Sequence, residues 1–272
     1  MTTRVAIVGG TGKLGRVILE VVESEPDFAV HAVLSSRDDI AAIDGADLVV
    51  DASTPAVSID VVRAAIERGI NVLVGTSGWS AERIAAVRPL VDAQGTGAVF
   101  IPNFSLGSVV GSALAAVAAP FFASIEIVEA HRDTKVDSPS GTAVRTAEMV
   151  AAARSEVGPV QAPHVDQRAR GQRVAGVPVH SLRRPGVVAR QEVVLSGPGE
   201  TLTIVHDTAD PAAAYAPGIR LALRAARDAR GVVIGLDSFI DLGIRLPGAT
   251  PTTSGPGIAD GVPGQVARAT DV

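Results

Sequence analysis

The sequence predicts an α/β fold in which a doubly wound parallel sheet is followed by a second region of the α+β kind. Strand-like and helix-like segments alternate from residue 4 to residue 103. The strand-like runs are apolar on both faces, as strands in a helix-covered parallel sheet are. Beyond residue 120 the strands are set close together and joined by tight turns, which favours a mixed or antiparallel sheet.

In the first half, the sequence predicts strands over 4–10, 28–36, 47–53, 70–78 and 97–103, and helices over 13–25, 55–69 and 80–93. Helix 13–25 places Leu14, Ile18 and Val21 on one stripe, as expected of a helix that buries one face. Helix 55–69 has Pro at its start and Gly at its end, where helices tolerate these residues best.

In the second half, the sequence predicts helices over 105–118, 140–156 and 211–229, and strands over 124–132, 173–183, 187–197 and 200–208. The uncharged stretch 101–125 contains "GSVVG", which also matches a membrane-helix motif. It is rich in Ala, Ser and Gly, and Pro102 and Pro120 bracket it, so a buried helix explains it better. Residues 245–272 are rich in Gly, Pro, Thr and Ala without periodicity and predict a disordered tail.

The composition describes a globular protein with ample core material. Hydrophobic residues make up 47%, charged residues 19% and aromatic residues 3% of the 272 residues, so we expect a core of aliphatic side chains. A net charge of −5 without a basic run suggests neither a nucleic acid nor an anionic membrane as partner. With no Cys and five scattered His, we expect no disulfide and no metal site. A strand pattern begins at Arg4 and leaves no room for a signal peptide, so we expect a cytoplasmic protein.

A glycine-rich segment, "GGTGKLG", joins the first strand to the first helix. Its glycines follow a GxxGxxG spacing, a variant of the dinucleotide fingerprint of Rossmann-like folds. Glycines let the backbone approach a pyrophosphate, which binds the free N–H groups at a helix start. A tight turn without a ligand is the alternative, but the strand before and the helix after favour a cofactor site. The expected cofactor residues here are Gly9, Thr11, Gly12, Lys13, Leu14 and Gly15.

The choice of cofactor is read at the end of the second strand, where an Asp or Glu would hold the ribose of NADH. Here the sequence has Ser35, Ser36 and Arg37, and Asp38 follows one step later. Two hydroxyls and a guanidinium suit a 2′-phosphate, because Arg binds phosphate in bidentate fashion. We therefore expect NADPH, with NADH also possible, against the alternative of an ordinary loop.

Three further segments fall where predicted strands end: "DASTP" (51–55), "GTSG" (75–78) and "PNFS" (102–105). Each combines small residues that expose backbone with hydroxyl or amide groups, and each alone is an ordinary turn sequence. Because the carboxyl ends of parallel strands share one edge, together they can line a nicotinamide pocket. The residues expected there are Ala52, Ser53, Gly75, Thr76, Ser77, Pro102, Asn103 and Phe104.

The segment "EAHRDTKVDSPSGTA" (129–143) concentrates charged groups just before a helix. Ser140 is a candidate N-cap, which turns the N–H groups of Gly141 and Thr142 into an anion site. Lys135 adds positive charge, and His131 offers a proton near neutral pH. The alternative is a solvated loop in which Asp133 and Asp137 neutralise Arg132 and Lys135, and spacing alone does not decide between the two.

These motifs together resemble the dihydrodipicolinate reductase family, also called 4-hydroxy-tetrahydrodipicolinate reductase, of lysine and diaminopimelate biosynthesis. The family signature E-x-H-H-x-x-K-x-D-A-P-S-G-T-A is similar to residues 129–143, and "GGTGKLG", "VGTSGW", "PNFSLG" and "ARQEVVLSGPGETLTIVHD" extend the likeness over residues 4–243. The resemblance implies a Rossmann-like dinucleotide-binding domain with an inserted α+β domain that binds substrate and builds a homotetramer. The implied division is 1–104 with 208–244, 105–207, and the tail 245–272.

The resemblance also implies hydride transfer from NAD(P)H to a cyclic imine dicarboxylate, a small-molecule substrate. It makes His131 the general acid, Lys135 a catalytic or charge-neutralising residue, and Ser140, Gly141 and Thr142 the carboxylate site. In the same way it brings Gly75, Ser77, Asn103 and Phe104 to the nicotinamide, and Gly9, Gly12, Gly15 and Arg37 to the phosphates and ribose.

The chain departs from the family pattern at four positions. The second His of the signature, which contacts substrate, is Arg132 here, and Ser138, Ala52 and Arg190 replace an alanine, an aromatic residue and a histidine. Arg132 changes the size of the substrate pocket. Two alternatives follow: a paralogous reductase of another cyclic imine or keto acid, or a non-catalytic dinucleotide-binding regulator. Retention of both His131 and Lys135 speaks against the regulator.

Overall fold

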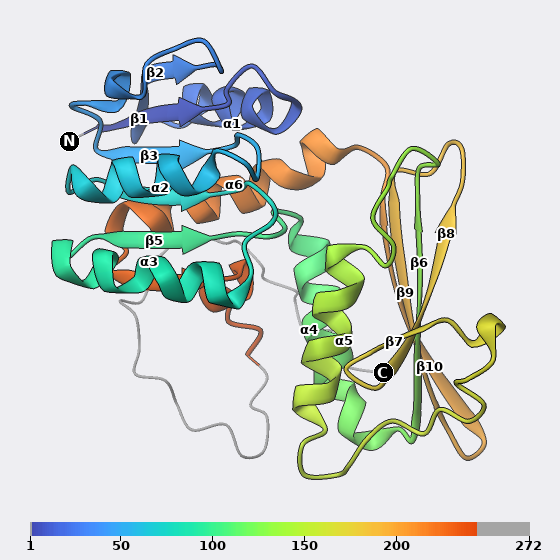
Figure 1. Cartoon of the computed structure of the whole chain (residues 1–272). Coiled ribbons are helices and arrows are strands. Elements are labelled where there is room, and N and C mark those ends of the chain that lie inside the picture. Colours follow the sequence, from blue (N-terminus) through green and yellow to red (C-terminus); the bar gives the residue numbers. More distant parts are fainter. Residues whose placement is uncertain (1, 244–272) are drawn as a thin grey trace, which may run out of the picture. The chain divides into compact units, whose positions relative to one another are not determined.

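The computed structural model describes residues 2–243, and within them a six-stranded parallel sheet runs in the order β11-β5-β4-β3-β1-β2 (Figure 1). Its strands are β1 (Thr3–Val8), β2 (Phe28–Leu34), β3 (Leu48–Asp51), β4 (Asn71–Val74), β5 (Gly97–Phe100) and β11 (Gly231–Ile234). Strand β11 pairs with β5 although the two lie far apart in the sequence. The C-terminal part of the described chain therefore completes the sheet that the N-terminal part begins.

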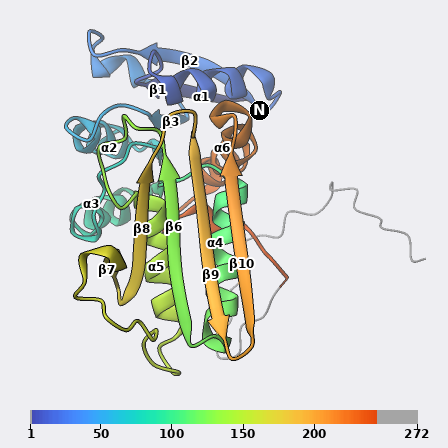
Figure 2. The same cartoon turned by 90° about the vertical axis from the view of Figure 1, so that its right-hand side faces the viewer.

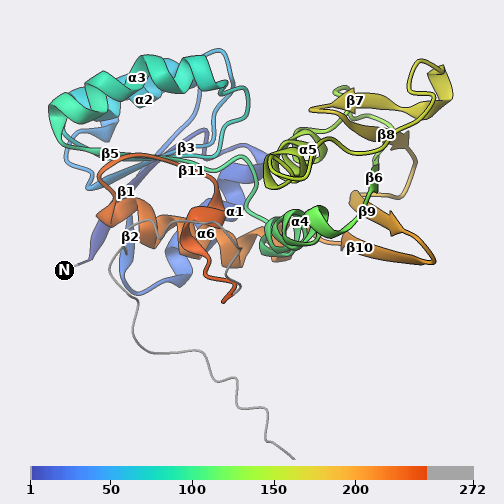
Figure 3. The same cartoon turned by 90° about the horizontal axis from the view of Figure 1, so that it is seen from below.

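Helices cover both faces of this sheet (Figure 3). Helices α1 (Lys13–Ser24) and α6 (Pro211–Asp228) lie on one face, and α2 (Ser58–Glu67) and α3 (Ala81–Gln94) on the other. Alternate strand residues supply the two cores: Val5 and Ile7 pack with α1 and α6, and Ala6 and Val8 with α2 and α3. Every residue of β3, β4 and β5 is buried, because both faces of these strands are covered. The predicted doubly wound, Rossmann-like sheet is confirmed.

The strand order reverses at β1, because β2 lies on one side of it and β3 on the other. In open α/β sheets, ligands bind in the crevice that such a reversal leaves at the carboxyl ends of the strands. The glycine-rich loop leaves β1 at this edge, and the loop that begins at Ala52 leaves β3 beside it. The fold therefore places two of the predicted cofactor loops at the point where a dinucleotide is expected.

The second sheet is mixed and runs in the order β10-β9-β6-β8-β7. Its strands are β6 (Ser124–His131), β7 (Gln172–Val174), β8 (Val177–Arg183), β9 (Ala189–Gly197) and β10 (Glu200–Thr208). Strands β6 and β8 are parallel and the other pairs antiparallel. Helices α4 (Leu106–Ala118) and α5 (Gly141–Ala153) lie behind this sheet in Figure 2, and a core that includes Ile125, Ile127, Ala147 and Val150 fills the space between. Short 3₁₀ helices span Ile40–Ile43, Ala119–Phe121, Arg168–Arg170 and Leu236–Phe239.

Many element ends differ from the prediction by one to four residues, and two differences have a clear structural cause. The segment 173–183, expected as one strand, is the hairpin β7–β8, because Ala175 and Gly176 adopt φ angles of 48° and 90°. Positive φ at both central residues is the conformation that two-residue hairpins favour. Helix α2 begins at Ser58 instead of Pro55, and the side chain of Ser58 is held by the buried carboxylate of Asp51.

Within the described chain, residues 2–242 form one compact unit. The boundaries expected for two domains within it therefore remain a prediction, and the expected tail, 245–272, lies outside the described residues. Among the residues that the structure describes, no helix has both the length and the apolar character needed to cross a membrane. The segment that resembled a membrane helix forms α4, whose Ala115 is fully buried in the core of the second sheet.

Candidate active site

The glycine-rich loop has no room for side chains at two of its positions. Gly9 has a φ of 82°, and a Cβ there would lie 2.4 Å from the carbonyl oxygen of Ala52. A Cβ on Gly15 would lie 2.2 Å from the carbonyl oxygen of Gly9. Helix α1 starts at Lys13, and within the described chain no side chain caps it at Gly12. The N–H groups at its start are therefore open to an anionic group, and Thr11 is exposed beside them.

The loops after β4 and β5 pack against this glycine loop. A Cβ on Gly75 would lie 2.8 Å from the ring of Phe104 and 3.2 Å from the side chain of Leu14, so these three expected cofactor residues lie together. The Gly75 N–H donates to the Asp51 carbonyl at 2.9 Å, and the Thr76 hydroxyl donates to the same oxygen at 3.3 Å. Ser77 and Pro102 are exposed on the same two loops. The structure thus brings the ends of β3, β4 and β5 together at the cofactor edge.

A buried carboxylate, missed by the sequence analysis, supports two of these loops. Asp51 is fully buried and accepts hydrogen bonds from the Ser53 N–H at 3.0 Å, from the Ser53 hydroxyl at 2.5 Å and from the Ser58 hydroxyl. The Ser58 oxygen accepts in turn from the indole N–H of Trp79 at 2.8 Å. The sequence signal for this network was an Asp at the end of an otherwise apolar strand.

The loop after β2 meets the glycine loop through backbone contacts, because the N–H groups of Gly9 and Gly10 donate to the Leu34 carbonyl at 2.8 and 3.2 Å. The Ser35 hydroxyl donates to Asp38 at 2.7 Å and lowers the pKa of that carboxyl. Arg37 and Ser36 are exposed, and no side chain in the described part of the molecule pairs with the Arg37 guanidinium. Arg37 is therefore free to bind an anionic group, whereas Ser35 is already engaged.

Glu129 and His131 form the closest pair of titratable groups in the second sheet. Both lie on β6, and Nδ1 of His131 is 2.5 Å from Oε2 of Glu129. The Glu129 side chain is fully buried, and 15% of the His131 side chain is exposed. Burial raises the pKa of Glu129, but hydrogen bonds from His131 and Arg183 outweigh it and bring that pKa to about 2. Glu129 is thus an ionised, buried carboxylate that touches the candidate acid.

Arg183, a second residue that the sequence analysis missed, binds the other side of this carboxylate. It comes from β8 and donates to both oxygens of Glu129 at 3.0 Å. The same guanidinium donates to the carbonyl oxygens of Lys135 at 3.2 Å and Asp137 at 2.5 Å. The loop that carries Lys135 is therefore fastened to the end of β8. Pairing with a residue 54 positions away leaves no local sequence pattern by which Arg183 could be found.

The start of α5 is the candidate carboxylate site. Ser140 caps the helix, its hydroxyl accepting from the N–H of Ala143 at 3.3 Å, and its own N–H donates to Glu129 at 3.2 Å. The amide of Asn103, on a cofactor loop, donates to the hydroxyl of Thr142 at 3.2 Å. Direct contacts therefore join the cofactor edge, the start of α5 and the Glu129–His131 pair.

The charged loop between β6 and α5 fits neither sequence interpretation in full. Lys135 pairs with Asp137 at 2.7 Å. Desolvation raises the pKa of this exposed carboxyl, but the hydrogen bond from Lys135 outweighs it, so the pKa is lowered. The expected neutralisation of Lys135 by Asp137 is thus confirmed. Arg132 is exposed, and no described residue pairs with its guanidinium. A free cation consequently remains one residue after His131.

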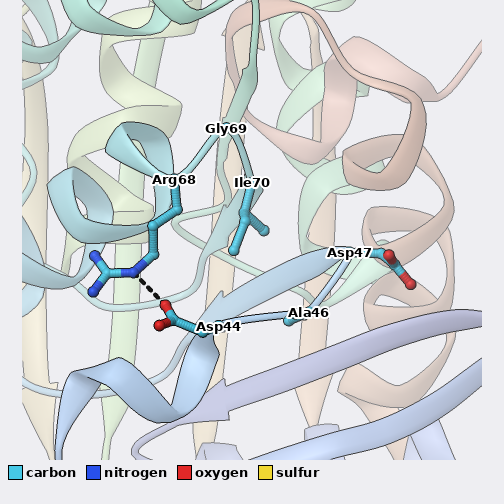
Figure 4. A pocket seen from close by; sticks show the side chains of 7 residues that line it. Asp44, Ala46, Asp47, Arg68, Gly69 and Ile70 are labelled. Atoms are coloured by element: carbon cyan, nitrogen blue, oxygen red, sulfur yellow. Dashed lines mark hydrogen bonds and ion pairs between the residues drawn. The ribbon is translucent and has the colours of Figure 1, made fainter.

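A wide depression of about 800 Å³ lies at the other edge of the parallel sheet, where β3 and β4 begin (Figure 4). Arg68 and Asp44 line it and pair with each other at 2.6 Å, and Asp47 pairs with Arg4 at 2.9 Å. Each charged side chain that lines it therefore already has a partner of opposite charge. The depression lies far along the strands from the glycine loop and is not the candidate site.

Two family models match the chain. The model described as dihydrodipicolinate reductase, N-terminus, matches residues 3–104, and that described as dihydrodipicolinate reductase, C-terminus, matches residues 107–240. A 4-hydroxy-tetrahydrodipicolinate reductase from Clavibacter michiganensis subsp. michiganensis is 58% identical over 243 residues, which cover 89% of this chain and 87% of that protein. A protein of the same name from Clavibacter sepedonicus is 55% identical and covers 99% of both chains.

Solved structures agree with this match. A dihydrodipicolinate reductase from Paenisporosarcina sp. TG-14 with bound dipicolinate has a TM-score of 0.74 at 26% identity, covering 88% of this chain and 100% of that one. An amine dehydrogenase from Mycobacterium smegmatis, with a TM-score of 0.60 at 13% identity, covers 90% of this chain and 98% of its own and shares the fold alone. The chain therefore belongs to the dihydrodipicolinate reductase family and is an NAD(P)H-dependent oxidoreductase.

Proposed function

We propose that the chain reduces 4-hydroxy-tetrahydrodipicolinate to tetrahydrodipicolinate in lysine and diaminopimelate biosynthesis, as the names of its relatives indicate for those proteins. The observation that carries the proposal is the set of contacts that joins His131, Glu129, Ser140, Thr142 and Asn103. These contacts place a proton donor and an anion-binding helix start beside the cofactor edge. A reductase of an anionic cyclic imine requires all three: a proton donor, a site for the carboxylate and a site for the hydride donor.

The start of α5 binds one carboxylate of the substrate. The N–H groups of Gly141 and Thr142 have no acceptor within the first helical turn, and the helix dipole favours negative charge there. Ser140 holds this geometry as the N-cap. The bound dipicolinate in the relative from Paenisporosarcina sp. TG-14, a planar ring with two carboxylates, supports a dicarboxylate ligand for the family fold.

The net reaction replaces a hydroxyl by a hydrogen, so it takes up one hydride and one proton and releases water. NAD(P)H, when bound, supplies the hydride. Loss of water leaves a conjugated unsaturated imine, and hydride addition at its far carbon leaves the anion of an enamine. The adjacent ring carbon then takes a proton, which His131 supplies as the general acid. Lys135 moves from Asp137 to the bound substrate and neutralises its charge.

Arg132 binds the second carboxylate in this proposal. No residue of the described part of the chain pairs with its guanidinium, which follows His131 directly, and an Arg fork holds a carboxylate in bidentate fashion. The same residue favours the one alternative that we retain, a reductase of a different cyclic imine or keto acid, because the longer side chain reshapes the pocket.

The cofactor loops fit a dinucleotide, since a Cβ at Gly9 or Gly15 would fill the cradle and the start of α1 is uncapped. We assign NADPH as the preferred donor on the free guanidinium of Arg37. We also propose a cytoplasmic homotetramer built through the second sheet, a substrate and tetramerisation domain over 105–207, and a dinucleotide-binding domain over 1–104 and 208–244. Sedimentation of the intact protein tests the tetramer.

Turnover of freshly generated 4-hydroxy-tetrahydrodipicolinate tests the proposed function. The wild-type protein should oxidise NADPH with this substrate, and His131→Gln should lose most of the rate while still binding NADPH. Binding of NADPH without turnover would contradict the assignment. In that case, gain of activity on Arg132→His would identify Arg132 as the cause, and continued inactivity would favour a different substrate.

A further inference from the structure

We infer that Glu129 is the positioning residue of the active site: it fixes the proton of His131 on Nδ1, so that Nε2 delivers the proton, and it anchors the start of the carboxylate-binding helix. The inference rests on the proposed function for the role of His131 as the acid. The inference goes beyond the proposed function because it names the nitrogen atom of His131 that gives the proton and the carboxylate that selects this atom.

Glu129 has a donor on every side of its carboxylate. Oε2 accepts from His131 Nδ1 at 2.5 Å and from Arg183 at 3.0 Å. Oε1 accepts from Arg183 at 3.0 Å and from the N–H of Ser140 at 3.2 Å. A buried carboxylate with this set of donors is held in place, because losing any of them leaves a charge uncompensated.

The state of Glu129 fixes the state of His131. A carboxylate whose pKa lies at about 2 is ionised at neutral pH and can only accept hydrogen bonds. His131 must then donate from Nδ1, and the proton that it exchanges sits on Nε2. In the reductive step the Nε2–H bond of the imidazolium breaks, the proton joins the ring carbon of the enamine anion, and the ring becomes a neutral imidazole with its proton on Nδ1. Solvent restores the proton on Nε2.

Arg183 extends this control to the loop of Lys135. It neutralises the charge of Glu129, and it also holds the carbonyl oxygens of Lys135 and Asp137. The acid, the lysine loop and the helix start therefore share one buried anchor. His131 contacts Glu129 on its own strand, pairs in register with Arg183 of β8, and accepts at its carbonyl oxygen from the N–H of Arg184 at 2.8 Å. The loop that follows His131 carries Arg132, Lys135 and Asp137.

The same strand carries a matched pair on its other face. Glu126 accepts from His180 Nε2 at 2.8 Å and from Arg170, so it too lies between a His and an Arg. Burial raises its pKa, while hydrogen bonds from Arg170 and His180 lower it, with a net decrease. Its side chain is 27% exposed, and in the described structure it contacts none of the proposed site residues. Glu126 therefore controls for the loss of a Glu–His pair without loss of the site, once sedimentation shows that the variant assembles as the wild type does.

Nitrogen-15 NMR of the histidine rings in the wild-type protein tests the inference without any variant. With His131→Gln to assign the signal, neutral His131 should carry its proton on Nδ1. A neutral His131 with its proton on Nε2 would overturn the inference. This measurement needs no turnover, so it separates failure of the inference from failure of the proposed function.

Kinetics of Glu129→Gln and Glu126→Gln complete the test. Glu129→Gln should lower kcat about 100-fold, the low end of what general acid catalysis contributes, with KM for NADPH nearly unchanged. Glu129→Asp should recover part of the rate, and Glu126→Gln should match the wild type. No recovery by Glu129→Asp, or equal losses in both glutamine variants, would contradict the inference.

Discussion

The starts of helices α1 and α5 are two anion sites of opposite construction. At α1, glycines bring the backbone close and no described side chain caps the helix, so recognition is left to N–H groups. At α5, Ser140 caps the helix and a buried carboxylate, Glu129, holds the cap. The first site depends on the absence of Cβ atoms, and the second on side chains from strands β6 and β8 and from the loops at Asn103 and Ser140. The first is consequently sensitive to added volume and the second to lost hydrogen bonds.

The largest effect is expected from adding volume at α1. Gly15→Val should reduce NADPH affinity at least about 1,000-fold, because its Cβ would collide with the Gly9 carbonyl and open the pyrophosphate cradle. Gly141→Ala at the start of α5 is the matched control, since nothing lies within 4 Å of a Cβ there. Fluorescence titration with NADPH measures both variants. If Gly15→Val retained NADPH binding, the α1 site would not be more sensitive to added volume than the α5 site, and the contrast would be wrong.

Acid should act on the α5 site and spare the α1 site. The pKa of Glu129 is lowered to about 2 in the folded chain, so its contribution to stability is present above its unfolded pKa and lost as pH falls through about 2. The difference between this pKa and the ordinary value of 4.5 for a Glu side chain corresponds to about 3 kcal/mol of unfolding free energy. Urea unfolding of wild type and Glu129→Gln should differ most at neutral pH and converge in acid. A difference that is the same at pH 7 and pH 2.5 would speak against this pairing.

At the rim of the α1 site, Arg37 should discriminate between the two nucleotides. Arg37→Ala should raise KM for NADPH about tenfold or more, as expected for a lost charge-assisted bond, and leave KM for NADH within about twofold. Arg68→Ala, at the opposite edge of the sheet, controls for the loss of an arginine. Steady-state kinetics with both nucleotides decides the matter, and equal changes for NADPH and NADH would discard the 2′-phosphate role.

The smallest effect is expected for the link between the two sites. Asn103 donates to Thr142, so Asn103→Ala and Thr142→Val should each weaken substrate binding, and the double variant should lose less than their sum. A coupling of about 0.5–1 kcal/mol is expected for a single hydrogen bond of this kind. Thr142→Val keeps the helix N–H and the side-chain volume, which isolates the hydroxyl. Additive losses would mean that the sites are not linked through this contact.

The features of this molecule that the sequence predicts are those set by residues close together along the chain. The alternation of strands and helices and the glycine spacing are local, so the doubly wound sheet and the loop at Gly9 were predictable. Hairpin β7–β8 was not predicted because Ala175 adopts a positive φ, which Ala rarely does and which the sequence therefore does not indicate. In the site, Ser140 as an N-cap followed from local pattern.

The supporting residues of the site were not predictable in this way. Arg183 reaches Glu129 across 54 positions, and Asp51 joins Ser58 and Trp79 only because two strand ends meet. Glu129 was visible in the family signature, but its burial and its four donors depend on the mixed sheet, in which it lies between Ser181 and Gln191. Such contacts are set by strand register, which one sequence does not specify over this distance.

The central claim is that the start of α5, anchored by Glu129, binds a dicarboxylate beside the cofactor. Calorimetric titration of dipicolinate into the NADPH-loaded protein tests it most directly. We predict one dipicolinate per chain for the wild type, and binding about tenfold weaker for Ser140→Ala, which corresponds to the typical free energy of an N-cap. Equal affinity in the two proteins, or no dipicolinate binding by a protein that binds NADPH, would contradict the account.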